Sequence, residues 1–358
     1  MNSEPLPRRI ERFLRVEKSD DRSNAPEDDF GALALELFAY QFDRNKPYQA
    51  FCQAQGVTAA SIRRWEEIPA APIAAFKSAD LATFPLGRAA AVFHSSATTT
   101  GTPSRHYLKT LNYYEASLKA GFRRWVLPPS KETLPFLILA PAPGEAPHAS
   151  LSWMLDVVKR QWGGPGSDYF VQRGVLDEPR LTRVLNKLSA AGLPALLLGT
   201  TLAFLKFFDD CAARRASFKL APGSRLMDTG GMKTQKREIS RLEFVEQAGR
   251  FLGIPDEACI NEYGMCEMSS QFYAWGSSLR MQGPPWVRTR VLDWATGVEA
   301  DAGRPGLLVH YDLANVDSVL AIQTEDLGLA DGNAFIFQGR APQADLKGCS
   351  LAAETFLR

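Results

Sequence analysis

The sequence predicts an α/β protein whose large body of buried strands and covering helices is closed by a short β-rich C-terminal segment. Short apolar runs bounded by Pro or Gly, such as 136–140 and 195–199, alternate with longer amphipathic patterns. This alternation is typical of largely parallel strands covered by helices. From residue 288 onward, short strand-like runs are separated by turns rich in Gly and Asp, which is typical of a β-meander.

These patterns predict three segments along the chain. They are a polar lead-in (1–28), an α/β body (29–287) and a β-rich closing segment (288–358). The length of 358 residues fits about two domains.

Individual elements follow from apolar spacing and punctuation. Apolar residues from Phe30 to Tyr40 recur at helical intervals and predict a helix with one buried face. Thr58 is a candidate N-cap for a helix over 59–66, and the proline-rich segment 68–77 is expected to be extended. Further helices are predicted at 112–125, 178–191 and 236–252, and strands of the closing segment at 290–294, 306–311, 319–323 and 334–338.

Composition excludes several classes of function. The 41 basic and 40 acidic residues leave a net charge of +1, so no strong field favours nucleic acid or an anionic membrane. The five cysteines are odd in number and form no CxxC pair, which argues against a disulfide framework or a zinc knuckle. The N-terminus has no apolar signal region, and the longest apolar stretch, 193–208, is interrupted by polar residues. We therefore expect a cytoplasmic protein without a membrane span.

A loop rich in hydroxyl side chains is the first candidate binding feature. It runs from Ser95 to Arg105 and follows the apolar run 89–93. Hydroxyls and backbone N–H groups of such a loop can hold phosphate oxygens, and Arg105 would add positive charge. The Walker pattern is absent. Taken alone, the loop is a weak signal, and a polar surface turn is the favoured interpretation.

Two acidic motifs follow later in the chain. In Asn261–Met268, Glu267 stands three residues after the glycine of a Tyr-Gly turn, where a carboxylate could hold Mg²⁺ together with substrate phosphates. In Gln323–Gly328, Glu325 and Asp326 form an acidic pair at the end of a strand-like run. Each motif alone could be a solvated turn.

The order of the motifs is more specific than any one of them. The Ser/Thr/Gly loop, Gly230-Gly231, Tyr-Gly-x-x-Glu267, Thr-x-Asp326 and Gly339-Arg340 follow one another in the order found in the adenylate-forming superfamily. Within it, the sequence most resembles the acyl-protein synthetases of the LuxE type, with phenylacetate-CoA ligases as more distant relatives. The resemblance covers nearly the whole chain after residue 28, and its most specific part is the ending Lys347-Gly-Cys-Ser-Leu351.

The resemblance implies roles for particular residues, with ATP and Mg²⁺ as cofactors. Gly230 and Gly231 would form a backbone wall beside the adenine, Tyr263 would stack near it, and Glu267 would ligate Mg²⁺. Asp326 would bind the ribose hydroxyls, and Arg340 the ribose or a phosphate. The residues that would cradle the β- and γ-phosphates are Ser95, Ser96, Thr98, Thr99 and Gly101.

The sequence departs from the family pattern at three positions. Ala97 replaces a glycine of the loop, Thr100 is inserted before Gly101, and Cys266 replaces the threonine that precedes the metal-binding glutamate. A thiol is a weaker hydrogen-bonding partner than a hydroxyl. These departures favour the alternative of a catalytically weakened, nucleotide-binding homologue.

The end of the chain bears on the second half-reaction. Only a short tail follows Arg340, and we expect it to lack the mobile C-terminal subdomain that supplies a catalytic lysine in acyl-CoA ligases. Lys233 and Lys347 are the candidates for that charge. Cys349 stands where LuxE-type enzymes carry their acylated thiol.

The sequence therefore predicts an ATP-dependent ligase acting in two steps. A carboxylic acid, expected from the resemblance to be a long-chain fatty acid, would form an acyl-AMP and then acylate Cys349. A partner protein such as a fatty acyl reductase would be the further acceptor. A CoA ligase, in which free CoA replaces the protein thiol, is the alternative within the enzymes.

Overall fold

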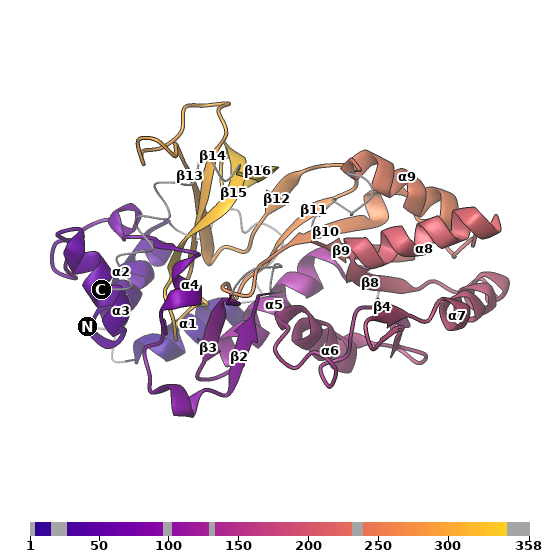
Figure 1. Ribbon diagram of the computed structural model, residues 1–358, viewed down its shortest axis with the longest axis horizontal. Helices are drawn as coiled ribbons and strands as arrows, with labels where there is room; N and C mark the ends of the chain where they lie inside the picture. The colour runs from indigo at the N-terminus through magenta and orange to yellow at the C-terminus, as the bar shows by residue number, and fades with distance from the viewer. Residues whose placement is uncertain (1–3, 16–26, 96–101, 129–132, 231–238, 342–358) are drawn as a thin grey trace. The chain divides into compact units, whose positions relative to one another are not determined.

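The computed structural model describes residues 4–15, 27–95, 102–128, 133–230 and 239–341. The chain divides into two compact units, drawn in Figure 1. Unit 1 comprises 1–120, 265–271 and 281–358, and unit 2 comprises 121–264 and 272–280. The α/β class with a β-rich C-terminal region predicted from the sequence is confirmed.

Unit 2 is built on a mostly parallel sheet. Its strands are ordered β5 (Asp168–Tyr169), β4 (Phe136–Leu139), β8 (Leu196–Thr200), β9 (Arg225–Thr229), β10 (Cys259–Tyr263) and β11 (Phe272–Trp275). All neighbours pair in parallel except β10 and β11, which are antiparallel. The continuous apolar run of β4 is buried at every position, as expected for a strand covered on both faces.

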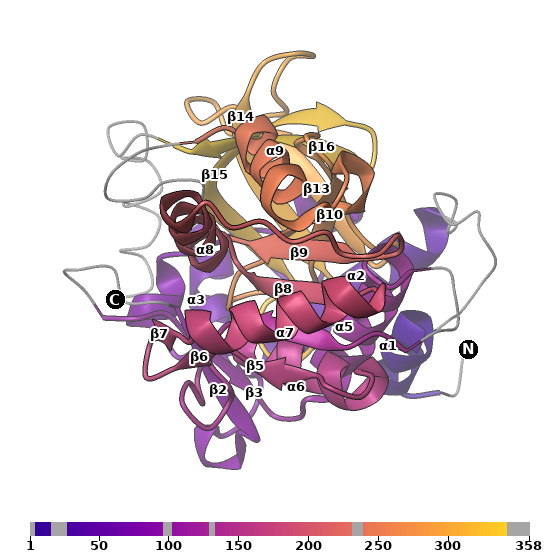
Figure 2. The same cartoon turned by 90° about the vertical axis from the view of Figure 1, so that its right-hand side faces the viewer.

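Helices pack against this sheet. They are α6 (Ser150–Trp162), α7 (Glu178–Ala191), α8 (Thr201–Arg214) and α9 (Arg241–Leu252). The short strands β6 (Val171–Gln172) and β7 (Val175–Leu176) pair with each other before α7. A 3₁₀ turn, Asp256–Ala258, follows α9. Buried side chains of α7, α8 and α9 form one apolar cluster with Leu197 and Leu226 of the sheet. Figure 2 turns these three helices toward the viewer.

Side-chain caps fix where the helices begin and end. Asp177 accepts a hydrogen bond from the N–H of Arg180 at the start of α7, and Gly192 ends the helix in the left-handed conformation. The predicted helices 112–125 and 178–191 are confirmed, the first as α5 (Asn112–Trp125). Helix α9 begins later than predicted, at residue 241. Ser240 and Glu243 form a capping box there, and residues 236–238 lie outside the described part of the chain.

Unit 1 carries an antiparallel sheet. Its strands are β13 (Val287–Leu292), β14 (Gly306–Asp312), β15 (Ala321–Asp331) and β16 (Ala334–Arg340), which lie side by side in orange and yellow in Figure 1. The short strand β1 (Ala71–Pro72) pairs in parallel with β15, and β12 spans Arg280–Gln282. β2 (Ala91–His94) and β3 (Arg105–Leu108) form a separate hairpin. The four strands predicted for the closing segment are confirmed, with shifted boundaries.

Besides the first part of α5, unit 1 has helices near the N-terminus. They are α1 (Leu6–Arg15), α2 (Glu27–Arg44), α3 (Lys46–Ala54), α4 (Ala75–Ser78) and the 3₁₀ turns Trp65–Glu67 and Leu86–Arg88. The helix predicted at 59–66 is wrong. The Ser61 hydroxyl accepts from the N–H of Thr58 and donates to its carbonyl oxygen, which closes a turn instead. The segment 68–77 is only partly extended, because α4 begins at Ala75.

The described residues also bear on two expectations drawn from composition. None of their helices is long and apolar enough to cross a membrane. Four of the cysteines, Cys52, Cys211, Cys259 and Cys266, lie within the described residues, and all are buried free thiols.

Candidate functional site

The base of the Ser/Thr loop is a closed hairpin in unit 1. Ser95 directly follows β2, and Ser104 directly precedes β3. The N–H of Ser104 donates to the Ser95 hydroxyl at 2.9 Å, and the N–H of Ser95 donates to the Ser104 carbonyl oxygen. These bonds bring the two ends of the loop together. Ser95 therefore anchors the loop, whereas Ser96, Thr98, Thr99 and Gly101 lie outside the described residues.

The positive charge of Arg105 in this hairpin forms an ion pair. Arg105 forms an ion pair with Asp80 at 3.2 Å, and the hydroxyl of Tyr107 donates to the same carboxylate oxygen at 3.1 Å. The Arg105 side chain is 35% exposed and that of Asp80 46% exposed. A phosphate near Arg105 would thus compete with an exposed ion pair, and such pairs contribute little to the stability of a protein.

His106 connects the hairpin to the Tyr-Gly-Met-Cys-Glu motif. Its side chain is buried, and Nδ1 lies 2.8 Å from the carbonyl oxygen of Cys266. A carbonyl oxygen only accepts, so the proton is on Nδ1 and Nε2 is an acceptor. Nε2 has no hydrogen-bond partner among the described residues. Burial lowers the pKa of His106 to about 4, so the imidazole is neutral near pH 7.

Glu267 is buried in unit 1, with 3% of its surface exposed. The Cys266 thiol beside it has a pKa raised above its usual range, chiefly by burial and then by the charge of Glu267, with which it hydrogen-bonds. Cys266 therefore stays protonated near neutral pH. It serves as a neutral neighbour of the Glu267 carboxylate and not as a nucleophile.

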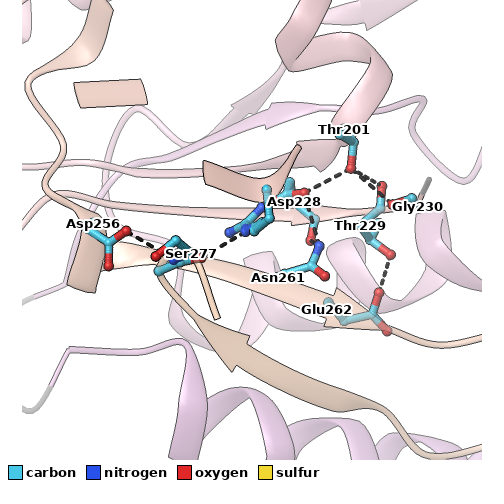
Figure 3. Close-up of polar contacts among 10 residues, drawn as sticks. Thr201, Asp228, Thr229, Gly230, Asp256, Asn261, Glu262 and Ser277 are labelled. Carbon is cyan, nitrogen blue, oxygen red and sulfur yellow. Dashed lines mark hydrogen bonds and ion pairs between the residues drawn. The ribbon is translucent and has the colours of Figure 1, made fainter. Parts of the chain in front are cut away.

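In unit 2, a buried polar network fixes the end of β9, where Gly230 lies. Asp228 accepts from Arg241 of α9 at 2.5 Å, and both side chains are almost fully buried. Figure 3 shows Thr201 and Asn261 converging on the same carboxylate, with donor distances of 2.8 and 3.1 Å. Because these bonds satisfy the buried Asp228 carboxylate, removing one partner would lower the stability of the folded protein.

The network continues into the turn that follows β9. The hydroxyl of Thr201 also lies within 3.1 Å of the Thr229 carbonyl oxygen and 3.3 Å of that of Gly230. Gly230 has a φ of 103°, a conformation that favours glycine. The backbone conformation at Gly230 is thus fixed, and its contact with adenine stays a prediction. Gly231 and Lys233 lie outside the described residues.

Glu262 is a buried acid that sequence analysis did not single out. It stands opposite Thr229 in the β9–β10 register, and the Thr229 hydroxyl hydrogen-bonds to its carboxylate, as Figure 3 shows. Burial raises the pKa of Glu262 to about 7, opposed by the Thr229 hydrogen bond and assisted by the charge of Asp228. Alternation along β10 could have placed Glu262 on the face opposite Asn261, but its burial depends on β9 and β11.

Tyr263 ends β10 and packs edge-on against Phe272, with ring centroids 5.9 Å apart. Its side chain is half-buried. The ring is therefore held by β11 directly before the chain returns to unit 1 at Met265.

Asp326 and Arg340 are brought together in unit 1. They are register partners on β15 and β16, and Arg340 Nε lies 3.7 Å from an Asp326 carboxylate oxygen. The register shifts by one residue at Leu327 and Gly328, and Gly339 has a φ of 98°. This bulge places Arg340 opposite Asp326. The Arg340 side chain is 71% exposed, whereas that of Asp326 is 15% exposed, so solvent reaches the pair from the side of Arg340.

The predicted site residues therefore fall into three groups. Ser95, Glu267, Asp326 and Arg340 belong to unit 1, and Gly230 and Tyr263 belong to unit 2. Cys349, like the four loop residues, Gly231 and Lys233, lies outside the described part of the chain. Among the described residues, no three His, Cys, Asp or Glu side chains come together as a metal site. A single carboxylate such as Glu267 suits Mg²⁺, which is held by one or two carboxylates together with substrate phosphates and water.

Two solved structures share the fold of this chain. An open form of 2-hydroxyisobutyryl-CoA ligase, in complex with 2-HIB-AMP and CoA, matches 91% of this chain and 75% of its own length at 14% identity, with a TM-score of 0.64. ATP-bound MatB from Rhodopseudomonas palustris matches 72% of this chain and 49% of its own at 16% identity, with a TM-score of 0.52. Identities this low show the fold alone.

A family model gives a more specific match. The model described as acyl-protein synthetase, LuxE, matches residues 18–357. A search of curated proteins found no match.

Glu262 generates a prediction about stability. An acid with a pKa near 7 in the folded chain and 4.5 in the unfolded chain lowers stability as pH rises from about 4.5 to about 7. The unfolded state ionises first, and the loss of stability is on the order of 3 kcal/mol once both states are ionised. Glu262→Gln should remove this loss. Its free energy of unfolding in urea should therefore exceed that of wild type by more at pH 8 than at pH 4.5.

The control for this prediction is Glu246→Gln, which changes an exposed glutamate of α9. Its difference from wild type should not vary in the same way with pH. Equal pH dependence in the Glu262 and Glu246 variants would show that folding does not raise the pKa of Glu262.

Proposed function

Because the chain belongs to the acyl-protein synthetase (LuxE) family and has the fold of adenylate-forming ligases, we propose that it activates a carboxylic acid with ATP and transfers the acyl group to a protein thiol. The observation that carries this proposal is the family match over residues 18–357. The order of the motifs between Ser95 and Arg340 supports it.

The first step forms an acyl-adenylate. A carboxylate oxygen of the acid attacks the α-phosphorus of ATP, and the bond from that phosphorus to the pyrophosphate oxygen breaks. Negative charge develops on the phosphate oxygens, so positioning and charge neutralisation provide most of the catalysis.

Glu267 and the Ser/Thr loop would hold the metal and the phosphates. Mg²⁺, when bound, neutralises phosphate charge and orients the oxygens. Glu267 provides a buried carboxylate of the kind that Mg²⁺ prefers. The Ser95–Ser104 bonds would keep the loop closed, so that Ser96, Thr98, Thr99 and Gly101 can present hydroxyls and N–H groups to the β- and γ-phosphates.

The nucleoside would be held by the remaining motif residues. Gly230 and Gly231 would lie against the adenine, with Tyr263 stacking near it. The Asp326 carboxylate would accept from the ribose hydroxyls, and Arg340, now paired with Asp326, would reach the ribose or a phosphate.

The second step transfers the acyl group to sulfur. The thiolate of Cys349 attacks the acyl carbon, the bond to the AMP oxygen breaks, and the thiol proton passes to solvent. Lys347 would favour the thiolate, and Lys233 would stabilise the α-phosphate charge. A long-chain fatty acid as the substrate and a fatty acyl reductase as the further acceptor are part of the proposal.

Two other functions have specific features in their favour. The fold similarity to 2-hydroxyisobutyryl-CoA ligase, whose complex contains CoA together with 2-HIB-AMP, favours free CoA as acceptor. Ala97, Thr100 and Cys266 favour a nucleotide-binding homologue with weakened catalysis.

Glu267→Gln should abolish acid-dependent ATP–pyrophosphate exchange while the fold is kept. Glutamine has the same shape but lacks the charge that holds the metal. The control Glu299→Gln removes an exposed carboxylate of unit 1 that pairs with Arg290, and it should exchange like wild type. Activity of Glu267→Gln within about tenfold of wild type, or ~1.4 kcal/mol, would rule out Glu267 as the metal ligand.

Cys349 should carry a thioester after incubation with ATP, Mg²⁺ and the acid. Mass spectrometry of wild type should show the acyl mass, and hydroxylamine should remove it. Cys349→Ser should keep pyrophosphate exchange but form no thioester. If wild type makes acyl-AMP while Cys349 stays unmodified, the acceptor is another thiol, and free CoA becomes the candidate.

A further inference from the structure

The connection between β14 and β15 in unit 1 is unusual because it is buried. Every residue from 306 to 322 is buried, although connections between antiparallel strands normally lie at the surface. The polar groups of a buried connection need partners within the protein. We call residues 312–318 of this connection the buried turn, and residues 265–271, which contain Glu267, the Glu267 segment.

Gln41 of α2 and Asn45, the residue after α2, supply partners for the backbone of the β14–β15 connection. Gln41, fully buried, donates to the carbonyl oxygen of Asn315 at 2.7 Å and accepts from the N–H of Leu320 at 2.9 Å. Asn45, also fully buried, donates to the carbonyl oxygen of Ser318 at 3.2 Å. These bonds hold the turn from the side of α2.

The side chains of the buried turn hold the Glu267 segment. Asn315 Nδ2 donates to the carbonyl oxygen of Glu267 itself at 2.9 Å. Asp312 accepts from the hydroxyl of Ser270 at 2.7 Å and from the N–H of Ser269 at 3.1 Å. Burial raises the pKa of Asp312 to about 6, which shows that keeping this carboxylate here costs free energy.

The same turn holds the hairpin that carries the Ser/Thr loop. Asp317 accepts from the N–H of Lys109, the residue after β3, at 3.2 Å. Earlier in β3, His106 donates to the carbonyl oxygen of Cys266 at 2.8 Å. The hairpin, the Glu267 segment and the buried turn are thus joined pairwise by side-chain hydrogen bonds within unit 1.

We propose that the buried turn is a positioning element: through Asp312, Asn315 and Asp317 it fixes the Glu267 segment relative to the hairpin of β2 and β3, and so holds the backbone that carries the proposed metal ligand Glu267. The metal role of Glu267 rests on the proposed function. None of the three residues is assigned to contact the substrate, so their effect acts through Glu267 and the hairpin.

Asn315→Asp tests this directly. It keeps the shape of the side chain but replaces the donor to Glu267 with a carboxylate that repels the carbonyl oxygen. The Mg²⁺ concentration for half-maximal pyrophosphate exchange should rise by about 10- to 100-fold, as for other partners that orient metal ligands. Asp312→Asn, with the same shape, should act in the same direction and provides a second variant if Asn315→Asp does not fold.

A second measurement does not depend on activity. Hydrogen–deuterium exchange without metal or nucleotide should be faster in peptides covering 265–271 for both variants, because the bonds to Glu267 and Ser269 are lost. The control Tyr48→Phe removes one buried hydrogen bond of unit 1, from its hydroxyl to the Pro69 carbonyl oxygen at 2.6 Å. It should lower stability without changing the Mg²⁺ requirement or exchange in 265–271.

The proposal is overturned if amide exchange in 265–271 is unchanged in both variants. It is also overturned if amide exchange in 265–271 becomes faster while the Mg²⁺ concentration for half-maximal pyrophosphate exchange is the same as in the control Tyr48→Phe. Failure of the proposed function would be seen separately, because wild type would then show no acid-dependent pyrophosphate exchange, or Glu267→Gln would stay active. Amide exchange would still decide whether the buried turn holds the Glu267 segment.

Discussion

Burial of the β14–β15 connection is the constraint on which the proposed phosphate-binding half of the candidate site depends. A turn without access to water must find a partner for each N–H and carbonyl group. Here Gln41 of α2 and Asn45 bond to the backbone of the connection, and the side chains of the turn bond to the hairpin and to the Glu267 segment. The same bonds that satisfy the turn therefore tie together segments more than 200 residues apart in sequence, since Gln41 and Asn315 are 274 residues apart.

In unit 2, a buried ion pair holds a turn next to motif residues. The end of β9 and the Gly230 turn are fixed by the buried pair of Asp228 and Arg241, with Thr201 and Asn261 satisfying the remaining carboxylate positions. A buried pair contributes little net stability compared with an apolar core, but it fixes geometry. In both units, polar groups are buried next to motif residues. In unit 2 the apolar cluster under α7, α8 and α9 contributes compensating stability.

Local features of the structure could be predicted from the sequence, and distant contacts could not. Helices α5 and α7 follow from apolar spacing, and α7 also has caps that are local in sequence. The helix expected at 59–66 failed because Ser61 turns back onto Thr58, a competition that spacing does not reveal. The burial of Glu262 and the role of Asn315 depend on strands and turns far along the chain. The proposed ligand contacts of Ser96, Lys233 and Cys349 stay predictions.

The central claim is that the protein makes an acyl-adenylate, and acid-dependent exchange of labelled pyrophosphate into ATP tests it most directly. Wild-type protein would be assayed with Mg²⁺ and a panel of fatty, aryl and hydroxy acids, each against a no-acid control. Exchange that requires both Mg²⁺ and an acid, and is highest with long-chain fatty acids, is the expected result. Binding of ATP without exchange for any acid would contradict the claim and leave a nucleotide-binding homologue.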